Sequence, residues 1–223
     1  MRSIFLAALG AAVLVGLAPV AHATKPLLDC EAGTVDKVLC DHTELMALHQ
    51  RVIATVNQAL TKAEQAEQTD TMADTIDATQ EKIIGEHSGW LASRANCLDV
   101  VASTPRDCLI QMYSTRAAEL VAEWQLLPPT HNEIYLCNAT TVMVTHFPTD
   151  HPVITLEYDD NRAVFKAVPA ASGLKFEGPF GQFWWQKGPE RMFLKDLDKE
   201  PIDCVNAEGM RPLGTAPLNG TRP

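Results

Sequence analysis

Two short stretches, SGLKF at residues 172–176 and FWWQKG at residues 183–188, are the strongest indication of how the second half of this chain folds. Each combines a β-prone run of aromatic or long side chains with a glycine, and glycine permits the tight turns that connect neighbouring strands. Cys137 and Cys204 flank both stretches. We therefore expect a small β domain, tied together by a Cys137–Cys204 disulfide, that presents two polar loops.

The first residues of the chain indicate export. Arg2 precedes an apolar run at residues 4–20, and the tripeptide AHA at residues 21–23 fits the small-residue pattern that signal peptidase cleaves. We expect residues 1–23 to be a cleaved signal peptide. The first cysteine, Cys30, lies beyond that cleavage site, which argues against a lipid anchor, and no later apolar run reaches membrane-spanning length. The mature protein is expected to be periplasmic or secreted, and soluble.

Cysteine usage and net charge limit the classes of partner. The chain has 6 cysteines, all beyond the predicted cleavage site, and an even number in an oxidising compartment predicts disulfides. No C-x-x-C pair is present, which argues against metal binding by cysteine, and we expect no metal site and no cofactor. The formal net charge is -10, which argues against nucleic acid as a partner. The negative charge suits a cationic partner, and it equally fits an exported protein that is acidic for solubility alone.

A change in amino-acid composition divides the mature chain into two parts. Residues before Pro128 and Pro129 are rich in Ala, Glu, Gln and Leu, whereas Val, Thr, Phe and Trp dominate afterwards. A Pro-Pro pair cannot continue a helix and marks a boundary. We therefore predict a helical domain at residues 24–127, a β domain at residues 128–206 and a disordered, Pro- and Gly-rich tail at residues 207–223.

The first domain reads as three helices. Apolar residues recur at helical spacing over residues 43–68, a polar turn at residues 69–71 precedes a second helix that ends near Cys97, and a third helix runs from Thr104 to Trp124 with a proline in its first turn. Short connections predict an antiparallel bundle. Three histidines are expected on the helix surfaces: His42, His49 and His87.

Four cysteines belong to this helical domain. Cys40 begins the first predicted helix, Cys97 ends the second and Cys108 begins the third, while Cys30 lies on the approach to the first helix. These three helix ends meet at one end of an antiparallel bundle. Four cysteines allow three pairings that the sequence does not distinguish. We favour Cys40–Cys97 with Cys30–Cys108.

The helical half resembles a known family. Cys30, Cys40, the motif W-L-x-x-R-x-x-C at residues 90–97, and Cys108 followed by Y-x-x-R at residues 113–116 are similar to the LprI-like domain, over roughly residues 28–126. Some relatives are lysozyme inhibitors and many have no known role. We interpret four residues of these motifs as core anchors or ion-pairing residues rather than partner contacts: Trp90, Arg94, Tyr113 and Arg116.

The second domain reads as strands. Turn signals at residues 159–161 and 178–181 separate several of the runs. Many short strands at regular spacing predict an antiparallel barrel, so the fold class is α+β in two domains: a disulfide-stapled antiparallel helical bundle followed by an antiparallel β-barrel. The β-prone runs are residues 133–137, 141–147, 153–158, 163–168, 174–177, 182–186, 191–194 and 202–205.

The β domain resembles the C-type lysozyme inhibitors of the MliC/PliC family over about residues 133–205. Tyr135-x-Cys137, the SGLKF stretch, the WQKG stretch with its following Glu190, and Cys204 carry the resemblance. Two departures are a phenylalanine at position 176, where the family usually has tyrosine, and an interval between the loops that is longer by one residue. The resemblance implies lysozyme contacts at Ser172, Gly173, Lys175, Phe176, Trp185, Lys187, Gly188 and Glu190.

The resemblance implies an inhibitor rather than an enzyme. In the family, the first-loop serine and the second-loop lysine reach the catalytic groups of lysozyme, so Ser172 and Lys187 are expected to plug its cleft and protect bacterial peptidoglycan. C-type lysozymes are strongly basic, in keeping with an acidic inhibitor. Lys175 and Glu190 are alternatively expected to brace the two loops through an ion pair.

Two other functions fit parts of the sequence. A peptidoglycan-binding or cell-envelope-binding module would use Trp184 or Trp185 to stack on sugars, although alternation along a strand would turn only one of them outward. Residues 172–175 also fit the S-x-x-K motif of penicillin-binding proteins and serine β-lactamases. The companion S-D-N and K-T-G motifs are missing and the segment reads as a strand, so we predict no enzyme.

Overall fold

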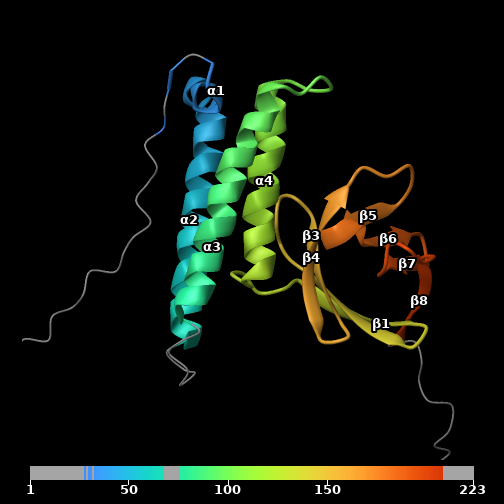
Figure 1. The fold of residues 1–223 in the computed structure, drawn as a ribbon. Helices are drawn as coiled ribbons and strands as arrows, with labels where there is room; N and C mark the ends of the chain where they lie inside the picture. Colours follow the sequence, from blue (N-terminus) through green and yellow to red (C-terminus); the bar gives the residue numbers. More distant parts are fainter. Residues whose placement is uncertain (1–27, 29, 32, 68–75, 208–223) are drawn as a thin grey trace, which may run out of the picture.

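The computed structural model describes residues 28, 30, 31, 33–67 and 76–207. The predicted signal peptide, the turn at residues 69–71 and the tail beyond residue 207 lie outside the described residues. A helical region with disulfides is followed by a closed antiparallel barrel, which confirms the predicted fold class (Figure 1). Among the helices of the described part of the chain, none combines the length and apolar character needed to cross a bilayer.

The helical region contains one helix more than the sequence predicted. α1 is a separate short helix that Thr34 caps through Lys37 N at 3.1 Å, and an extended backbone at His42 separates it from α2. Thr104 caps α4 in the same way, through Asp107 N, with Pro105 in the first turn as predicted. The elements are α1 (Val35–Asp41), α2 (Thr43–Glu67), α3 (Ile76–Ser93), the 3-10 turn η2 (Arg94–Leu98) and α4 (Pro105–Glu123).

The favoured disulfide pairing is wrong. Cys30 is bonded to Cys40 and Cys97 to Cys108, with Cα–Cα distances of 5.9 and 5.6 Å. The error has a physical cause: Cys40 lies in α1 rather than at the start of α2, so the approach to α1 brings Cys30 beside it. The short connection from η2 to α4 likewise brings its two cysteines together. Both disulfides therefore join residues that are close in sequence, with separations of 10 and 11 residues.

The core of the bundle is partly polar. His49 and His87 are buried, so the prediction that they are surface residues is wrong, and His42 is half-buried with Nδ1 at 2.8 Å from Val38 O. His49 Nδ1 lies 3.1 Å from the Tyr113 hydroxyl. His87 stacks on Trp90 with ring centroids 5.7 Å apart. The apolar residues around this cluster include Leu45, Val52, Val56, Ile83, Leu109 and Leu120.

Arg94 joins α1 to α4 within this core. It is only 7% exposed, its Nη1 donates to the Tyr113 hydroxyl at 2.7 Å, and its Nη2 lies 3.1 Å from Asp36 Oδ1. The expectation that Arg94 and Tyr113 act inside the fold is consistent with these contacts. Removing one partner of a buried ion pair leaves an uncompensated charge, which is strongly destabilising.

Arg94→Met is therefore expected to lower the free energy of unfolding by about 3 kcal/mol, measured by urea denaturation. Arg106→Met is the matched control, because Arg106 pairs with Glu44 and Asp107 at the surface. The control should lose less than about 1 kcal/mol. Equal losses in the two variants would contradict a structural role for the buried pair.

His87 makes the stability of the bundle depend on pH. Burial, and then the charges of Arg116, Arg94 and His49, lower its pKa to about 4. The unfolded chain binds this proton near the ordinary histidine pKa, so between about pH 6.5 and pH 4 acidification favours unfolding. From pH 7 to pH 5 the wild type should lose about 2 kcal/mol more unfolding free energy than His87→Gln. Urea melts at both pH values test this, and parallel losses would refute it.

The β domain is an eight-stranded barrel in which each strand pairs with its sequence neighbours and β1 closes against β8. All eight predicted strands are found, with ends that differ by at most two residues. The Cys137–Cys204 disulfide joins directly opposed residues of β1 and β8, as predicted. The strands are β1 (His131–Cys137), β2 (Thr140–His146), β3 (Val153–Tyr158), β4 (Asn161–Val168), β5 (Leu174–Glu177), β6 (Phe183–Lys187), β7 (Glu190–Leu194) and β8 (Ile202–Asn206), with a 3-10 turn η3 (Pro179–Gly181) between β5 and β6.

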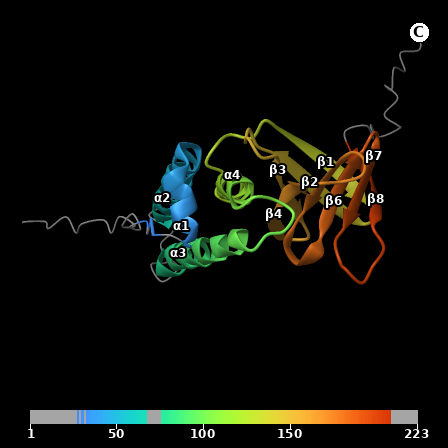
Figure 2. The same ribbon diagram turned by 90° about the horizontal axis from the view of Figure 1, so that it is seen from above.

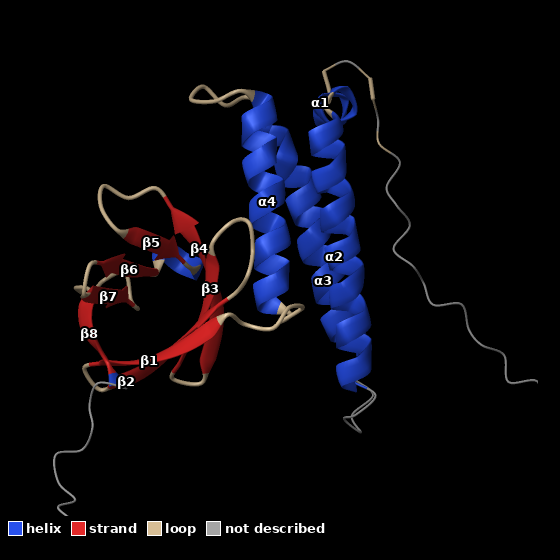
Figure 3. Cartoon of the chain, turned by 180° about the vertical axis from the view of Figure 1, so that it is seen from behind, coloured by secondary structure: helices blue, strands red, loops and turns tan. Residues whose placement is uncertain are grey.

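One side of the barrel packs on α4. Ala118 and Ala122 of α4 form an apolar cluster with Phe147 and Val153. Arg162 of β4 adds polar contacts by donating to the carbonyls of Ala122 and Glu123 at 2.7 and 2.9 Å. Figures 2 and 3 show α4 between the other helices and strands β3 and β4. Strands β6 to β8 therefore lie on the side of the barrel away from the helices.

Candidate functional site

The two predicted loops lie at the same end of the barrel. In an antiparallel barrel whose strands follow the chain order, alternate connections return to the same end. The β4–β5 connection carries Ser172 and Gly173, and the β6–β7 turn carries Gly188 next to Lys187. Pairing of β5 with β6, in which Leu174 opposes Gln186, places the two connections side by side.

The first loop is held against the second by close backbone contact. Gly173 has φ +69°, and a Cβ atom at this position would lie 2.1 Å from Gln186 O and 3.0 Å from Lys187 Cα. Only glycine allows this approach. The Trp185 indole Nε1 donates to Ser172 O at 2.8 Å, and the Ser172 side chain is exposed. The two loops thus form one continuous rim.

Lys187 extends from this rim into solvent. Its Nζ lies 5.8 Å from the centroid of the Trp185 ring, and among the described residues no hydrogen bond or ion pair of this ammonium is found. The adjoining turn is a two-residue hairpin loop with Gly188 at φ +57°, the positive φ that a type II′ turn requires at its first position. The ammonium is therefore available to a partner.

Arg191 supports this turn, although sequence reasoning did not select it. Its Nη1 donates to Gly188 O at 2.7 Å and to Glu190 O at 3.0 Å, while its Nε donates to the Tyr135 hydroxyl at 3.3 Å. The guanidinium thus links the lysine turn to β1, the strand beyond β8 in the closed barrel. An arginine one residue after the glutamate carries no motif that would reveal this role.

The structure does not place all predicted contact residues on the rim. Phe176 is 1% exposed and packs in the barrel core, so its expected contact with a partner is not supported, and the tyrosine-to-phenylalanine departure falls on an inward position. Lys175 pairs with Glu177 of its own strand at 3.0 Å and lies over the Phe183 ring, so this ion pair does not brace the two loops against each other. Glu190 is exposed opposite Lys187 on β7.

The tryptophan pair alternates as expected for a strand. Trp184 is fully buried and meets Tyr135 edge-on with centroids 5.0 Å apart, whereas Trp185 is only half-buried on the outer face. The S-x-x-K segment runs from a loop into β5 and not along a helix, and Lys175 is engaged with Glu177. The geometry of a serine nucleophile activated by this lysine is therefore not formed.

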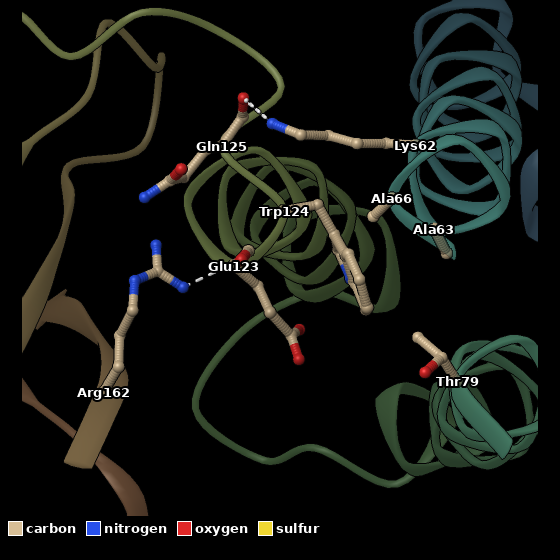
Figure 4. Close-up of a pocket in the computed structure, with 8 residues that line it drawn as sticks. All are labelled: Lys62, Ala63, Ala66, Thr79, Glu123, Trp124, Gln125 and Arg162. Carbon is tan, nitrogen blue, oxygen red and sulfur yellow. Dashed lines mark hydrogen bonds between the residues drawn. The ribbon is translucent and has the colours of Figure 1, made fainter. Parts of the chain in front are cut away.

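A groove between the helices and the barrel is a separate feature. It has a volume of about 380 Å³, and Lys62 and Arg162 close its rim by donating to the carbonyls of Gln125 and Glu123 (Figure 4). Burial raises the pKa of the Glu123 carboxyl, with a further contribution from Glu86. The groove borders the ends of α2 and α3, whose connecting residues 68–75 lie outside the described part of the chain.

The geometry of the loops predicts different outcomes for two glycine substitutions. Gly188→Ala introduces a positive-φ alanine in open space and should cost about 1–2 kcal/mol of unfolding free energy. Gly173→Ala adds a collision with Gln186 O, so the loop must move and the Trp185–Ser172 hydrogen bond should break. Hydrogen exchange of the Trp185 indole N–H, followed by NMR, should accelerate in Gly173→Ala only. Equal protection in both variants would contradict the close contact.

Comparison with known families gives a match to the barrel. Residues 135–202 match the family model of MliC, described as membrane-bound lysozyme-inhibitor of c-type lysozyme. The match runs from Tyr135 in β1 to the first residue of β8 and includes both loops of the rim. No family model matches the helical region, so its resemblance to the LprI-like domain stays a prediction. A search of curated proteins finds no match to the chain.

Proposed function

We propose that this protein inhibits C-type lysozyme and that the rim formed by Ser172 and Lys187 enters the catalytic cleft of the enzyme. The observation that carries the proposal is the MliC match over residues 135–202, which contains a rim whose Lys187 ammonium is exposed, lies near the Trp185 ring and has no hydrogen bond or ion pair among the described residues. On this proposal the protein is not an enzyme and acts after export, in the periplasm or outside the cell.

The chemistry of the rim suits the cleft of a glycosidase. Such a cleft holds two carboxyl groups on either side of the scissile bond, one of them ionised. A lysine ammonium placed between them gains charge-assisted hydrogen bonds, each worth about 1.5–3 kcal/mol. The Ser172 hydroxyl, which donates or accepts, matches a carboxyl group in either protonation state. Gly173 and Arg191 hold the two loops in place beforehand, which lowers the entropic cost of binding.

The net charge supports association with a basic enzyme. The chain carries -10 overall, and complementary fields raise the association rate without requiring a particular contact. Lys187 acts against this background, since it presents a local positive charge to an acidic cleft. The long-range attraction thus comes from the negative net charge of the chain, whereas the local contact comes from the positive charge of Lys187. The test must separate these two effects.

Lys187→Ala is expected to weaken inhibition of hen-type lysozyme by about tenfold or more, because it removes charge-assisted hydrogen bonds. Lys199→Ala is the matched control: it removes the same charge from the β7–β8 connection at the other end of the barrel, where Lys199 pairs with Asp196. The inhibition constant is measured from lysis of bacterial cells. Equal effects of the two substitutions would refute the role of Lys187 in the cleft.

The competing cell-envelope module has a distinct signature. Trp185, half-buried on the outer face beside Phe183 and Lys175, would then stack on a sugar. Sedimentation of the wild-type protein with purified cell wall, in the absence of lysozyme, would favour that function. An inhibitor should remain in the supernatant and form a stoichiometric complex with lysozyme.

A further inference from the structure

Three metal-ligating side chains meet at the barrel end that carries the rim. His131 and His146 are directly opposed on β1 and β2, and Glu133 lies two residues after His131. Because side chains alternate along a strand, His131 and Glu133 share the inward side of β1 with the buried Tyr135. His131 is exposed while Glu133 and His146 are half-buried, so the cluster opens to solvent.

The distances approach those of a coordinated ion. Nε2 of His146 and Nε2 of His131 lie 3.4 and 3.9 Å from the same oxygen, Glu133 Oε2. Bonds of about 2.0–2.1 Å to a tetrahedral ion separate neighbouring ligand atoms by roughly 3.3 Å. The imidazole rings are stacked at 4.0 Å between centroids, so one ring must turn about χ2 to direct its nitrogen at a shared ion. This torsion is soft in histidine.

Hydrogen bonds around the cluster orient its ligands. The Thr130 hydroxyl donates to His146 O at 3.2 Å and lies 3.3 Å from His131 Nδ1. With its proton engaged, the Thr130 oxygen accepts from Nδ1–H of His131, and this tautomer leaves the Nε2 lone pair free. His146 Nε2 is buried, and its contact with the Glu133 carboxylate at 3.4 Å does not have the geometry of a hydrogen bond. Tyr135 interacts through its hydroxyl with the Glu133 carboxylate.

The chemistry of these three side chains favours Zn²⁺ over Mg²⁺ and Ca²⁺. Two imidazoles and one carboxylate are typical ligands of Zn²⁺, whereas Mg²⁺ and Ca²⁺ prefer oxygen ligands only. Arg191 is a cation that faces His146, although its N–H groups are engaged by Gly188 O, Glu190 O and the Tyr135 hydroxyl. Glu133 supplies the compensating negative charge. Repulsion from Arg191 is expected to weaken the binding of a cation at this site.

We propose that His131, Glu133 and His146 form a Zn²⁺-binding site at the end of the barrel, with a coordination position left open. This proposal does not rest on the proposed inhibition of lysozyme, and it is tested without lysozyme. The site also has a physical connection to the rim, since Arg191 joins Tyr135, next to Glu133, to the turn that carries Lys187.

The test is isothermal titration of the mature protein, without a histidine tag, with Zn²⁺ and separately with Mg²⁺. One equivalent of Zn²⁺ should bind and Mg²⁺ should not. His146→Ala should weaken Zn²⁺ binding by more than about 100-fold, because loss of a direct ligand exceeds the roughly 10–100-fold cost of losing a supporting partner. Thr130→Val, which removes only the hydroxyl that orients His131, should weaken binding by about tenfold.

Two controls localise Zn²⁺ binding to this cluster. His42→Ala removes a histidine of the helical region and should leave Zn²⁺ affinity unchanged. Visible absorption of the Co²⁺-loaded protein should show four-coordinate geometry in the wild type and in His42→Ala, and lose it in His146→Ala. Absence of Zn²⁺ binding to the wild type, or unchanged affinity in a folded His146→Ala protein, overturns the proposal. So does a loss of affinity in His42→Ala.

Discussion

Closure of the barrel between β1 and β8 is the constraint that organises the whole β domain. Cys137 and Cys204 are opposed residues of these two strands and are joined across a sequence separation of 67 residues. On chain-entropy grounds, a bridge over such a loop contributes about 4 kcal/mol. Closure also removes the exposed edges that an open sheet would leave. It brings Arg191 of β7 within hydrogen-bond reach of Tyr135 on β1, which links the lysine turn to the strand beyond β8.

The helical region packs against the barrel along β3 and β4. Small residues on α4, Ala118 and Ala122, leave room for Phe147 and Val153, so the interface is apolar at its centre. The helices therefore enlarge the surface without covering the two loops of the rim.

The whole chain is acidic, which attracts a basic partner from a distance, while the rim offers Lys187 as an exposed cation. The proposed contact in a catalytic cleft would need rigid loops, and the close packing of the first loop on β6 and the hydrogen bonds of the β7 arginine provide this rigidity.

Much of the fold could be predicted from the amino-acid sequence alone. The correct predictions include the helical first half and β second half, the eight strands, the inward and outward alternation of Trp184 and Trp185, and the Cys137–Cys204 disulfide. These features follow from local propensity, from period-two patterning and from the pairing of the first strand with the last. The capped start of α4 at Thr104 was readable for the same reason, because a cap and a first-turn proline act over only a few residues.

Contacts between residues that are distant in sequence required the three-dimensional arrangement. His131, Glu133 and His146 form no recognisable spacing along the chain, and the β1–β2 register alone places them together. The local pairing of the four helical cysteines depended on a short helix, α1, that periodicity did not reveal. His49 and His87 are buried because aromatic residues of α4 and α3 pack against them in the bundle. The sequence determines which side-chain groups are present, but the packing of the helices and strands determines the distance between any two of them.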